Sequence, residues 1–508
     1  MRLRCLIFFL LSIVLSTFAQ AGDTLDIQRK IVHSFSPVQR FRRQVYVNPA
    51  LNYHLQDFSL SSLSVNADWE DRGRAFLAEE GDGGKTMGVQ TESFLRFSDK
   101  VRVFGRAGYH KEHRGNVLWN ETSDYGVIAP YVTADSIGGS MDGEEYSFMG
   151  GYAREIGKWT VGASLDYRAA IYYRQKDPRP KNVISDINAT LGVSRALSDT
   201  HYLGFSLFLR KYNQDSNISF YSDLGSTSVY QMLGLGMDYV RFAGNQFSST
   251  YKGKGVGVGF DLLPRAQNGL SASFQVNHFA LEKLLSSINY APIVKMNKNT
   301  ASFELAWLTS YKKLLLGARL EALGRLNSGK ENIFGDPSGG SYPIISRLKQ
   351  YTDKQMDLTL TGILSSNSDK RNRTWSILPF VGFSWEKTAY KIPERSMEWT
   401  TLRLGMKSNA SFPVKGGLLQ ADLSLGYDSN LSADYLLNGL NLQSAVGMTV
   451  FQNYTYLKDS FAHLGLSCRY DHLLVGNKTL FASLSWKHAA YKESGTLNHL
   501  QAGIGLTF

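Results

Sequence analysis

Apolar and polar side chains alternate along much of the chain. Over residues 159–171, Trp, Val, Ala, Leu, Tyr, Ala and Ile take every second position, with Thr, Gly, Ser, Asp and Arg between them through Arg168. The same period recurs over 314–322 and 419–428. A period of two is typical of a β-strand with one apolar and one polar face. Because aspartate, arginine and glutamine would be costly in a dry sandwich core, the polar face predicts a hydrated lumen and the apolar face a lipid surface.

Short turns and longer connections alternate between the predicted strands. Turns such as 157–158 and 368–372 are short and polar, whereas the longer connections lie at 114–143, 213–250, 283–297, 328–352 and 430–458. Outer-membrane barrels sort their connections in this way, with turns in the periplasm and loops outside the cell. We therefore predict an all-β, transmembrane antiparallel β-barrel of about 18 strands (roughly 16 to 20) over residues 57–508. A further hairpin around Val229 to Arg241 would raise the count to about 20.

The first 21 residues have the pattern of a secretory signal peptide. Arg2 and Arg4 precede an apolar run over 5–18, and Ala19-Gln20-Ala21 has the small-x-small form of a cleavage site. The run is shorter than the roughly 20 residues that a spanning helix needs. Cleavage would remove Cys5 and leave Cys468 without a partner, so we expect no internal disulfide.

Residues 22–56 are too short for a domain and are predicted to form an N-terminal arm, either in the periplasm or folded into the lumen as a partial plug. Residues 26–35 have the spacing of a short amphipathic helix. A basic cluster of Arg40, Arg42 and Arg43 follows, and then Asn48-Pro49-Ala50. In the strand over 253–259 (GKGVGVG), glycines on the lumen side would let such a plug or an inward loop approach closely.

The last eight residues have the pattern of a barrel-assembly signal. Gln501, Gly503, Leu506 and Phe508 give the order polar, glycine, apolar, aromatic. This resembles the signal that the barrel-assembly machinery recognises on the last strand of bacterial outer-membrane proteins. The free carboxylate of Phe508 cannot lie in hydrocarbon, so its ring is expected at the periplasmic interface, where aromatic girdles lie.

The formal net charge of +11 points to anionic partners. Loop-side lysines would bind the phosphates of outer-membrane lipid and lipopolysaccharide, whereas nucleic acid is a poor partner for a secreted barrel. The candidate lumen charges are Arg102, Arg106, Arg168, Arg319, Glu321, Arg325, Arg403, Asp422 and Arg469. Their mixed signs favour cross-strand pairing that stiffens the wall, with selectivity for anionic solutes as the sharper alternative.

No catalytic motif accompanies this pattern. The histidines are dispersed, and none forms a recognisable arrangement with a serine or an acid. His110 and His113 have a metal-like spacing, but residues three apart on a strand point to opposite faces. We therefore expect no enzymatic activity, no catalytic or metal site and no cofactor.

Taken whole, the chain resembles the uncharacterised outer-membrane β-barrel family common in Bacteroidetes, with a short arm that carries Asn-Pro-Ala. Asn48, Pro49, Ala50, the serine-rich strand over 58–64 and the terminal strand carry this resemblance. It implies the outer membrane of a Gram-negative cell. The leading hypothesis is a channel or transport component for small polar solutes, assisted by a surface lipoprotein or a TonB-dependent receptor. The alternative is a structural or adhesion barrel that binds a surface partner through its long loops.

Overall fold

The computed structural model describes residues 26–222, 227–244, 248–338, 342–366 and 373–508. The predicted signal peptide and the predicted turn at 368–372 lie outside these residues. No helix within the described ranges is both long enough and apolar enough to cross a membrane.

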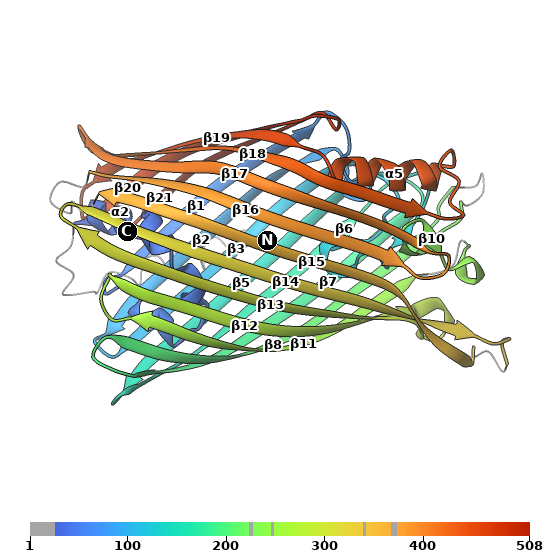
Figure 1. Ribbon diagram of the computed structural model, residues 1–508, viewed down its shortest axis with the longest axis horizontal. Helices are drawn as coiled ribbons and strands as arrows, with labels where there is room; N and C mark the ends of the chain where they lie inside the picture. The colour runs from blue at the N-terminus through green and yellow to red at the C-terminus, as the bar shows by residue number, and fades with distance from the viewer. Residues whose placement is uncertain (1–25, 223–226, 245–247, 339–341, 367–372) are drawn as a thin grey trace, which may run out of the picture.

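The described residues build one closed antiparallel barrel of 18 strands (Figure 1). Each strand pairs with its neighbour in the chain, and the last strand pairs with the first, which closes the ring. The barrel strands are β1 (Leu60–Arg72), β2 (Gly83–Ser98), β3 (Val101–Val117), β5 (Gly139–Ile156), β6 (Trp159–Tyr173), β7 (Arg179–Ala196), β8 (His201–Ser219), β11 (Ser249–Pro264), β12 (Gly269–Leu285), β13 (Ala291–Tyr311), β14 (Leu314–Phe334), β15 (Ile344–Ser366), β16 (Thr374–Tyr390), β17 (Arg395–Val414), β18 (Gly417–Leu437), β19 (Phe461–Leu474), β20 (Lys478–Tyr491) and β21 (Thr496–Thr507). The predicted fold class and strand number are confirmed.

Side chains alternate between the two faces of the wall, as the sequence period predicts. On the outer face, Leu165 is 52 % exposed, Leu191 51 % and Ile504 54 %. On the inner face, Thr160 and Ser194 are buried. An apolar outer surface around a polar interior is the inverse of a soluble core, and it is the arrangement that suits lipid.

Several predicted loops are shorter than expected because the strands continue into them. In the predicted connections 283–297 and 328–352, Val294 pairs with Glu331 and Lys295 pairs with Lys330. Likewise, β18 continues to Leu437 inside the connection predicted over 430–458. Beyond an apolar band both faces of a strand can be polar, so the alternation that marks a strand in the sequence fades there while the hydrogen-bonded ladder goes on.

The further hairpin around Val229 to Arg241 exists but does not join the wall. β9 (Tyr230–Gly234) pairs with β10 (Met237–Asp238) and with β4 (Thr133–Ala134) in a separate three-stranded sheet. The prediction of a larger barrel is therefore wrong, because this hairpin pairs with a neighbouring loop and leaves β8 paired directly to β11.

The two ends of the barrel differ. Short connections such as 157–158 and 415–416 lie at one end, which we call the turn end, and the longer ones, including that with helix α5 (Ala445–Leu457), lie at the other, the loop end. Figure 1 shows the barrel on its side, with the arm helix α2 (Ile27–Phe35) near the turn end at left and α5 at the loop end at right.

Candidate functional site: an occupied lumen

Residues 118–138, here called the crossing loop, lie inside the loop end of the barrel. The segment follows β3, contains the short helix α4 (Tyr125–Ile128) and β4, and returns to the wall at β5. Its Ile128, Tyr131 and Val132 are buried in an apolar cluster with side chains from the wall, including Tyr212, Phe279 and Tyr351. The loop therefore closes much of this end from within.

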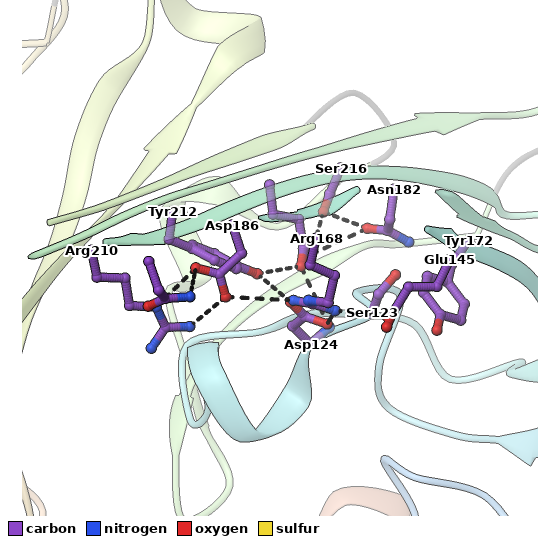
Figure 2. A network of polar contacts seen from close by, with 12 residues as sticks. Ser123, Asp124, Glu145, Arg168, Tyr172, Asn182, Asp186, Arg210, Tyr212 and Ser216 are labelled. Atoms are coloured by element: carbon purple, nitrogen blue, oxygen red, sulfur yellow. Dashed lines mark hydrogen bonds and ion pairs between the residues drawn. The ribbon is translucent and has the colours of Figure 1, made fainter. Parts of the chain in front are cut away.

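Asp124 fixes the near side of the crossing loop through a network that Figure 2 shows. Arg168 of β6 contacts both carboxylate oxygens of Asp124, with Nη1–Oδ1 at 3.1 Å, and its Nη1 also lies 3.1 Å from Glu145 Oε2. The hydroxyl of Tyr212 donates to Asp124 Oδ2 at 3.0 Å. Asp186 lies 3.9 Å from Arg168 and also pairs with Arg210, so the network continues along the wall. Hydrogen bonds to charged groups in such a site are stronger than neutral ones.

A second anchor holds the end of the crossing loop. Arg174, at the end of β6, lies 2.6 Å from Asp135 Oδ2 and 3.5 Å from Glu121 Oε1, and all three side chains are buried. Burial and the neighbouring Asp135 raise the pKa of Glu121 well above its ordinary value. Burial also acts to raise the pKa of Asp135, but Arg174, together with hydrogen bonds including that from the N–H of Gly138, outweighs it, and the net shift is downward. The anchor therefore consists of one ionised carboxylate, one protonated carboxyl and one guanidinium.

The far side of the crossing loop is fastened through its backbone. The hydroxyl of Tyr251 on β11 donates to the carbonyl of Tyr131 at 2.9 Å, and the buried Lys283 on β12 donates to the carbonyl of Val132 at 2.8 Å. The ring of Tyr131 contacts that of Tyr351 on β15, with centroids 5.9 Å apart. The loop thus reaches from β6 to β15 across the lumen.

The arm follows the inner wall around the turn end. Ile27 and Ile31 of α2 are buried against Leu418 of β18. After the short helix α3 (Pro37–Arg40), Phe41 packs in a cluster with residues of β13, β14 and β15. The 3₁₀ helices η1 (Arg43–Val47) and η2 (Leu51–His54) then bring the chain past β11 to Tyr53, which packs between β2, β3 and β5. The arm therefore lines the wall through a series of small separate clusters.

The Asn-Pro-Ala element contacts wall positions that have no side chain. The Nδ2 of Asn48 donates to Asp261 Oδ2 at 3.2 Å and to the carbonyl of Phe205 at 3.2 Å. A Cβ added at Gly162 would lie 2.5 Å from the carbonyl carbon of Pro49, and one at Gly192 would lie 2.1 Å from Asn48 Oδ1. These glycines let the arm backbone sit directly on β6 and β7.

The glycines predicted to admit a plug are different ones. Above Gly253 and Gly255, the space is filled by side chains of neighbouring strands, mainly Phe279. Above Gly259 it is filled by Ser206. The expectation for 253–259 is therefore wrong, because side chains of the strands beside β11, and not the backbone of the arm or of a loop, lie above these glycines.

Arg102 and His54 take part in the contacts between the last residues of the arm and the wall. Arg102 donates to the carbonyl of Ser98 at 2.7 Å and stacks over the ring of Tyr53, 4.7 Å from its centroid. The ring of His54 stacks on Tyr202 with centroids 3.9 Å apart. Burial, with help from Arg102 and Arg265, lowers the pKa of His54 to about 4, so this ring is neutral near neutral pH.

The predicted lumen charges lie on the inner face and are mostly paired locally. Arg106 pairs with Asp166 at 2.7 Å, Arg319 with Glu321 at 2.9 Å and Arg403 with Asp357 at 3.3 Å. Arg325 lies 3.6 Å from Asp353, Arg469 2.7 Å from Asp471, and Asp422 accepts from Asn409 at 2.7 Å. Arg319 and Arg469 also stack over Phe41 and Phe35 of the arm. Four of these contacts join different strands, whereas Arg319 and Arg469 pair within their own strands and hold the arm through Phe41 and Phe35.

A cavity of about 780 Å³, here called the chamber, remains beside the arm. Its lining combines Arg40 and Arg43 of the arm with wall residues of β14 to β20, including Lys407 and Lys487. A second cavity of about 450 Å³ lies on the other side of Arg40 and Arg43. Within the described ranges, no group of three or more His, Cys, Asp or Glu side chains is placed to hold a metal ion.

The terminal strand closes the barrel. In β21, Gly503 pairs with Asn66 of β1 and with Ser483 of β20, and Leu506 pairs with Leu63 and Leu480. Gln501 points to the same side as Gly503, and Leu506 is 38 % exposed on the outer face. Phe508 follows the last strand residue.

The residues that fasten the crossing loop were missed from the sequence. Glu121, Asp124 and Asp135 fall in a segment predicted only as an extracellular loop. One signal was present: residues 125–132 (YGVIAPYV) are far more apolar than a solvated loop requires. An apolar run between two strands indicates a loop that folds back onto the protein.

These features define a large closed β-barrel whose lumen holds its own N-terminal arm and one of its own loops. Residues 49–508 match the family described as "Family of unknown function (DUF6850)", and the chain belongs to this family. No curated protein matches the sequence.

Solved structures of outer-membrane proteins show a distant similarity. The ferric preacinetobactin receptor BauA of Acinetobacter baumannii is 10% identical, with 89% of this chain and 80% of that one covered, at a TM-score of 0.40. The ferric citrate transporter FecA is 9% identical, with 89% and 79% covered, at 0.39. A bacterial polysaccharide outer membrane secretin is 10% identical, with 89% and 98% covered, at 0.36.

Proposed function

We propose that this protein is a transport barrel for small polar solutes in the outer membrane of a Gram-negative bacterium. In this proposal the crossing loop is a fixed constriction at the extracellular end, and the arm is a removable plug at the periplasmic end. The resemblance to Bacteroidetes barrels, the signal peptide over 1–21 and the assembly signal formed by Gln501, Gly503, Leu506 and Phe508 remain predictions that belong to this proposal.

The outer-membrane location rests on the two faces of the wall. Exposed outward side chains such as Leu165, Leu191 and Ile504 would cost free energy in water, at roughly 25 cal/mol for each Å² of apolar surface. Lipid removes that cost, and a closed ring leaves no unpaired strand edge in it. Assembly by the barrel-assembly machinery and contact with lipopolysaccharide would follow from this location.

The observation that carries the transport proposal is the difference in how the two inserts are held. The crossing loop is fixed by buried charges at both ends, at Asp124 and at Asp135. The arm is held by several small apolar clusters and by hydrogen bonds such as those of Asn48, and Arg40 and Arg43 on it are exposed to open cavities. An insert held by several small contacts can detach stepwise, and each step costs little. A TonB-dependent receptor or a surface lipoprotein would supply the force that detaches the arm, or would deliver the solute.

Conductance in planar lipid bilayers tests this proposal. The full mature chain should show small or rare currents, and the chain lacking residues 22–56 should show a stable, larger conductance. As a matched control, Gly150→Ala should behave as the parent, because a Cβ at Gly150 meets nothing within 4 Å. A folded, heat-modifiable barrel without residues 22–56 that passes no current would overturn the transport proposal.

One observation favours the second candidate, a barrel that binds a surface partner. Helix α5 shows an apolar stripe to the outside, with Met448 54 % and Phe451 40 % exposed, next to Tyr435 of β18 at 42 %. Exposed apolar patches at a protein end often contact partners. If Met448→Ser with Phe451→Ser abolishes co-purification of a defined surface lipoprotein while conductance stays unchanged, the binding role is supported independently of transport.

A further inference from the structure

We infer that the chamber is a binding site for compact polyanions, solutes that carry two or more carboxylate or phosphate groups close together. This inference rests on the proposed transport function and names its substrate class.

Two lysines of the wall lie in one register row. Lys407 of β17 pairs with Ser424 of β18, and across the row Gly465 of β19 pairs with Lys487 of β20. Ser424 and Gly465 are themselves paired, so only small residues separate the lysines. Neighbouring strands lie about 4.8 Å apart, which puts the two lysine Cα atoms roughly 14 Å from each other. The space between the two lysine side chains is therefore wide enough for a small molecule. The part of the wall beneath this space carries only the small residues Ser424 and Gly465.

The space between the lysines stays open partly because Gly465 has no side chain. A Cβ at this position would lie 2.4 Å from Ser424 Oγ and 3.6 Å from Lys487 Cγ. Hydroxyl groups of the wall surround this space and can donate to an anion without adding charge. They are those of Thr359, Thr361, Ser424 and Ser485.

The arm supplies the opposite side of the site. Arg40 and Arg43 line the chamber and are exposed within it. In the part of the chain that the structure describes, no carboxylate lies within ion-pair distance of Arg40, Arg43, Lys407 or Lys487. Arginine and lysine side chains that converge on a cavity without carboxylate partners are suited to bind carboxylate or phosphate groups.

The acidic residues of the chamber offset only part of this charge, because six basic side chains line it against the three carboxylates of Glu321, Asp422 and Asp428. Asp422 accepts hydrogen bonds from Asn409 at 2.7 Å and from Ser467 at 2.9 Å. Glu321 pairs with Arg319 at 2.9 Å. Asp428 lies 3.9 Å from His463. The lining of the chamber therefore keeps an excess of positive charge, and four of its basic side chains have no carboxylate partner among the described residues.

Because the chamber lies between the wall and the arm, binding of the solute is coupled to the position of the arm. Of the six basic side chains that line the chamber, Arg40 and Arg43 lie on the arm, so departure of the arm removes two of the positive charges that face the solute. Affinity should fall as the plug leaves, and the solute is released at the moment the path to the periplasm opens.

Calorimetry on the full mature chain in detergent, with inorganic pyrophosphate as the probe, tests the inference. At low salt, pyrophosphate should bind once per chain. The variant Lys407→Gln with Lys487→Gln should lower the affinity by at least about tenfold, since a hydrogen bond to a charged group is worth about that much. The control variant Lys158→Gln with Lys312→Gln loses the same charge from turns outside the chamber and should bind as the parent does.

The outcomes separate this inference from the transport proposal. Absence of pyrophosphate binding at low salt, or equal losses in the two double variants, would overturn the anion site even if the arm-deleted barrel conducts. Binding that depends on Lys407 and Lys487 in a protein whose arm-deleted form passes no current would support the anion site and overturn transport.

Discussion

Arg168 of β6 contacts both carboxylate oxygens of Asp124, which lies 44 positions earlier in the chain, in the crossing loop inside the lumen. The pair joins the wall to the crossing loop, and Glu145, Asp186 and Tyr212 surround it (Figure 2). A carboxylate inside the lumen is therefore one of the groups that hold the crossing loop in place.

Removing this charge should loosen the crossing loop. For Asp124→Asn we expect the local free energy of opening to fall by about 2 kcal/mol, or roughly thirtyfold faster amide exchange over 118–138, because Arg168 loses its two-oxygen partner at a partly buried site. Hydrogen exchange with mass spectrometry measures this. Asp166→Asn is the matched control, since it breaks the Arg106 pair, which does not involve the loop. Equal exchange over 118–138 in both variants would contradict the assigned role of Asp124.

Adding side chains beneath the arm should displace it. A Cβ at Gly162 would lie 2.5 Å from Pro49, and Gly192→Val would meet Asn48. Such overpacking costs about 1–3 kcal/mol, so we expect Gly162→Val with Gly192→Val to raise the open fraction in bilayers by about tenfold. Gly324→Val adds the same bulk where a Cβ meets nothing within 4 Å, and it should leave the currents unchanged. Unchanged currents in the double variant would show that the arm does not gate the pore.

The wall could be predicted from the sequence because its signal is local. Alternation over residues such as Trp159 to Ile171 reports the two environments of each strand directly. The crossing loop could not be predicted in the same way. Its anchors, Asp124 with Arg168 and Val132 with Lys283, join residues far apart in the chain, and no period in the sequence marks such a contact.

For the arm, too, the local structure could be predicted from the sequence, but its contacts with the wall could not. The helix over 26–35 and the basic cluster after it were visible, but which wall receives Asn48 was not. Glycines serve as the receiving surface at Gly162 and Gly192, whereas those at Gly253 and Gly255 lie under Phe279. A glycine in a strand shows that space is needed there and does not show what fills it.

Loop docking at the loop end of the barrel should depend on pH through Glu79. Its Oε2 accepts a hydrogen bond from Asn453 of α5 at 2.7 Å, and burial raises its pKa to about 7 from an ordinary 4.5. The docked loop thus binds the proton more tightly than the undocked loop. Docking is most stable below the ordinary pKa and loses stability as pH rises through about 7.

Amide exchange over 73–82 and 445–457, corrected for its intrinsic pH dependence, should therefore increase between about pH 4.5 and pH 7 and level off above that range. Glu79→Gln should remove this increase, because the amide keeps the polar contact with Asn453 and cannot ionise. Glu80→Gln, a change at the exposed neighbour, should retain it. A Glu79→Gln protein with the parental pH profile would show that another group controls docking.

Phe508 should be required for efficient assembly, for two separable reasons. Its backbone N–H donates to the carbonyl of Ser61 at 2.9 Å and its carbonyl accepts from the N–H of Ser61 at 2.8 Å, so it adds the last rung between β21 and β1. Its ring is the aromatic residue of the predicted assembly signal. Deleting Phe508 removes both features, Phe508→Ala removes only the ring, and Phe508→Tyr keeps both. If recognition of the ring dominates, the heat-modifiable barrel in outer-membrane fractions should fall equally in the deletion and in Phe508→Ala, and stay at the parental level in Phe508→Tyr. Parental levels in the deletion would rule out both roles.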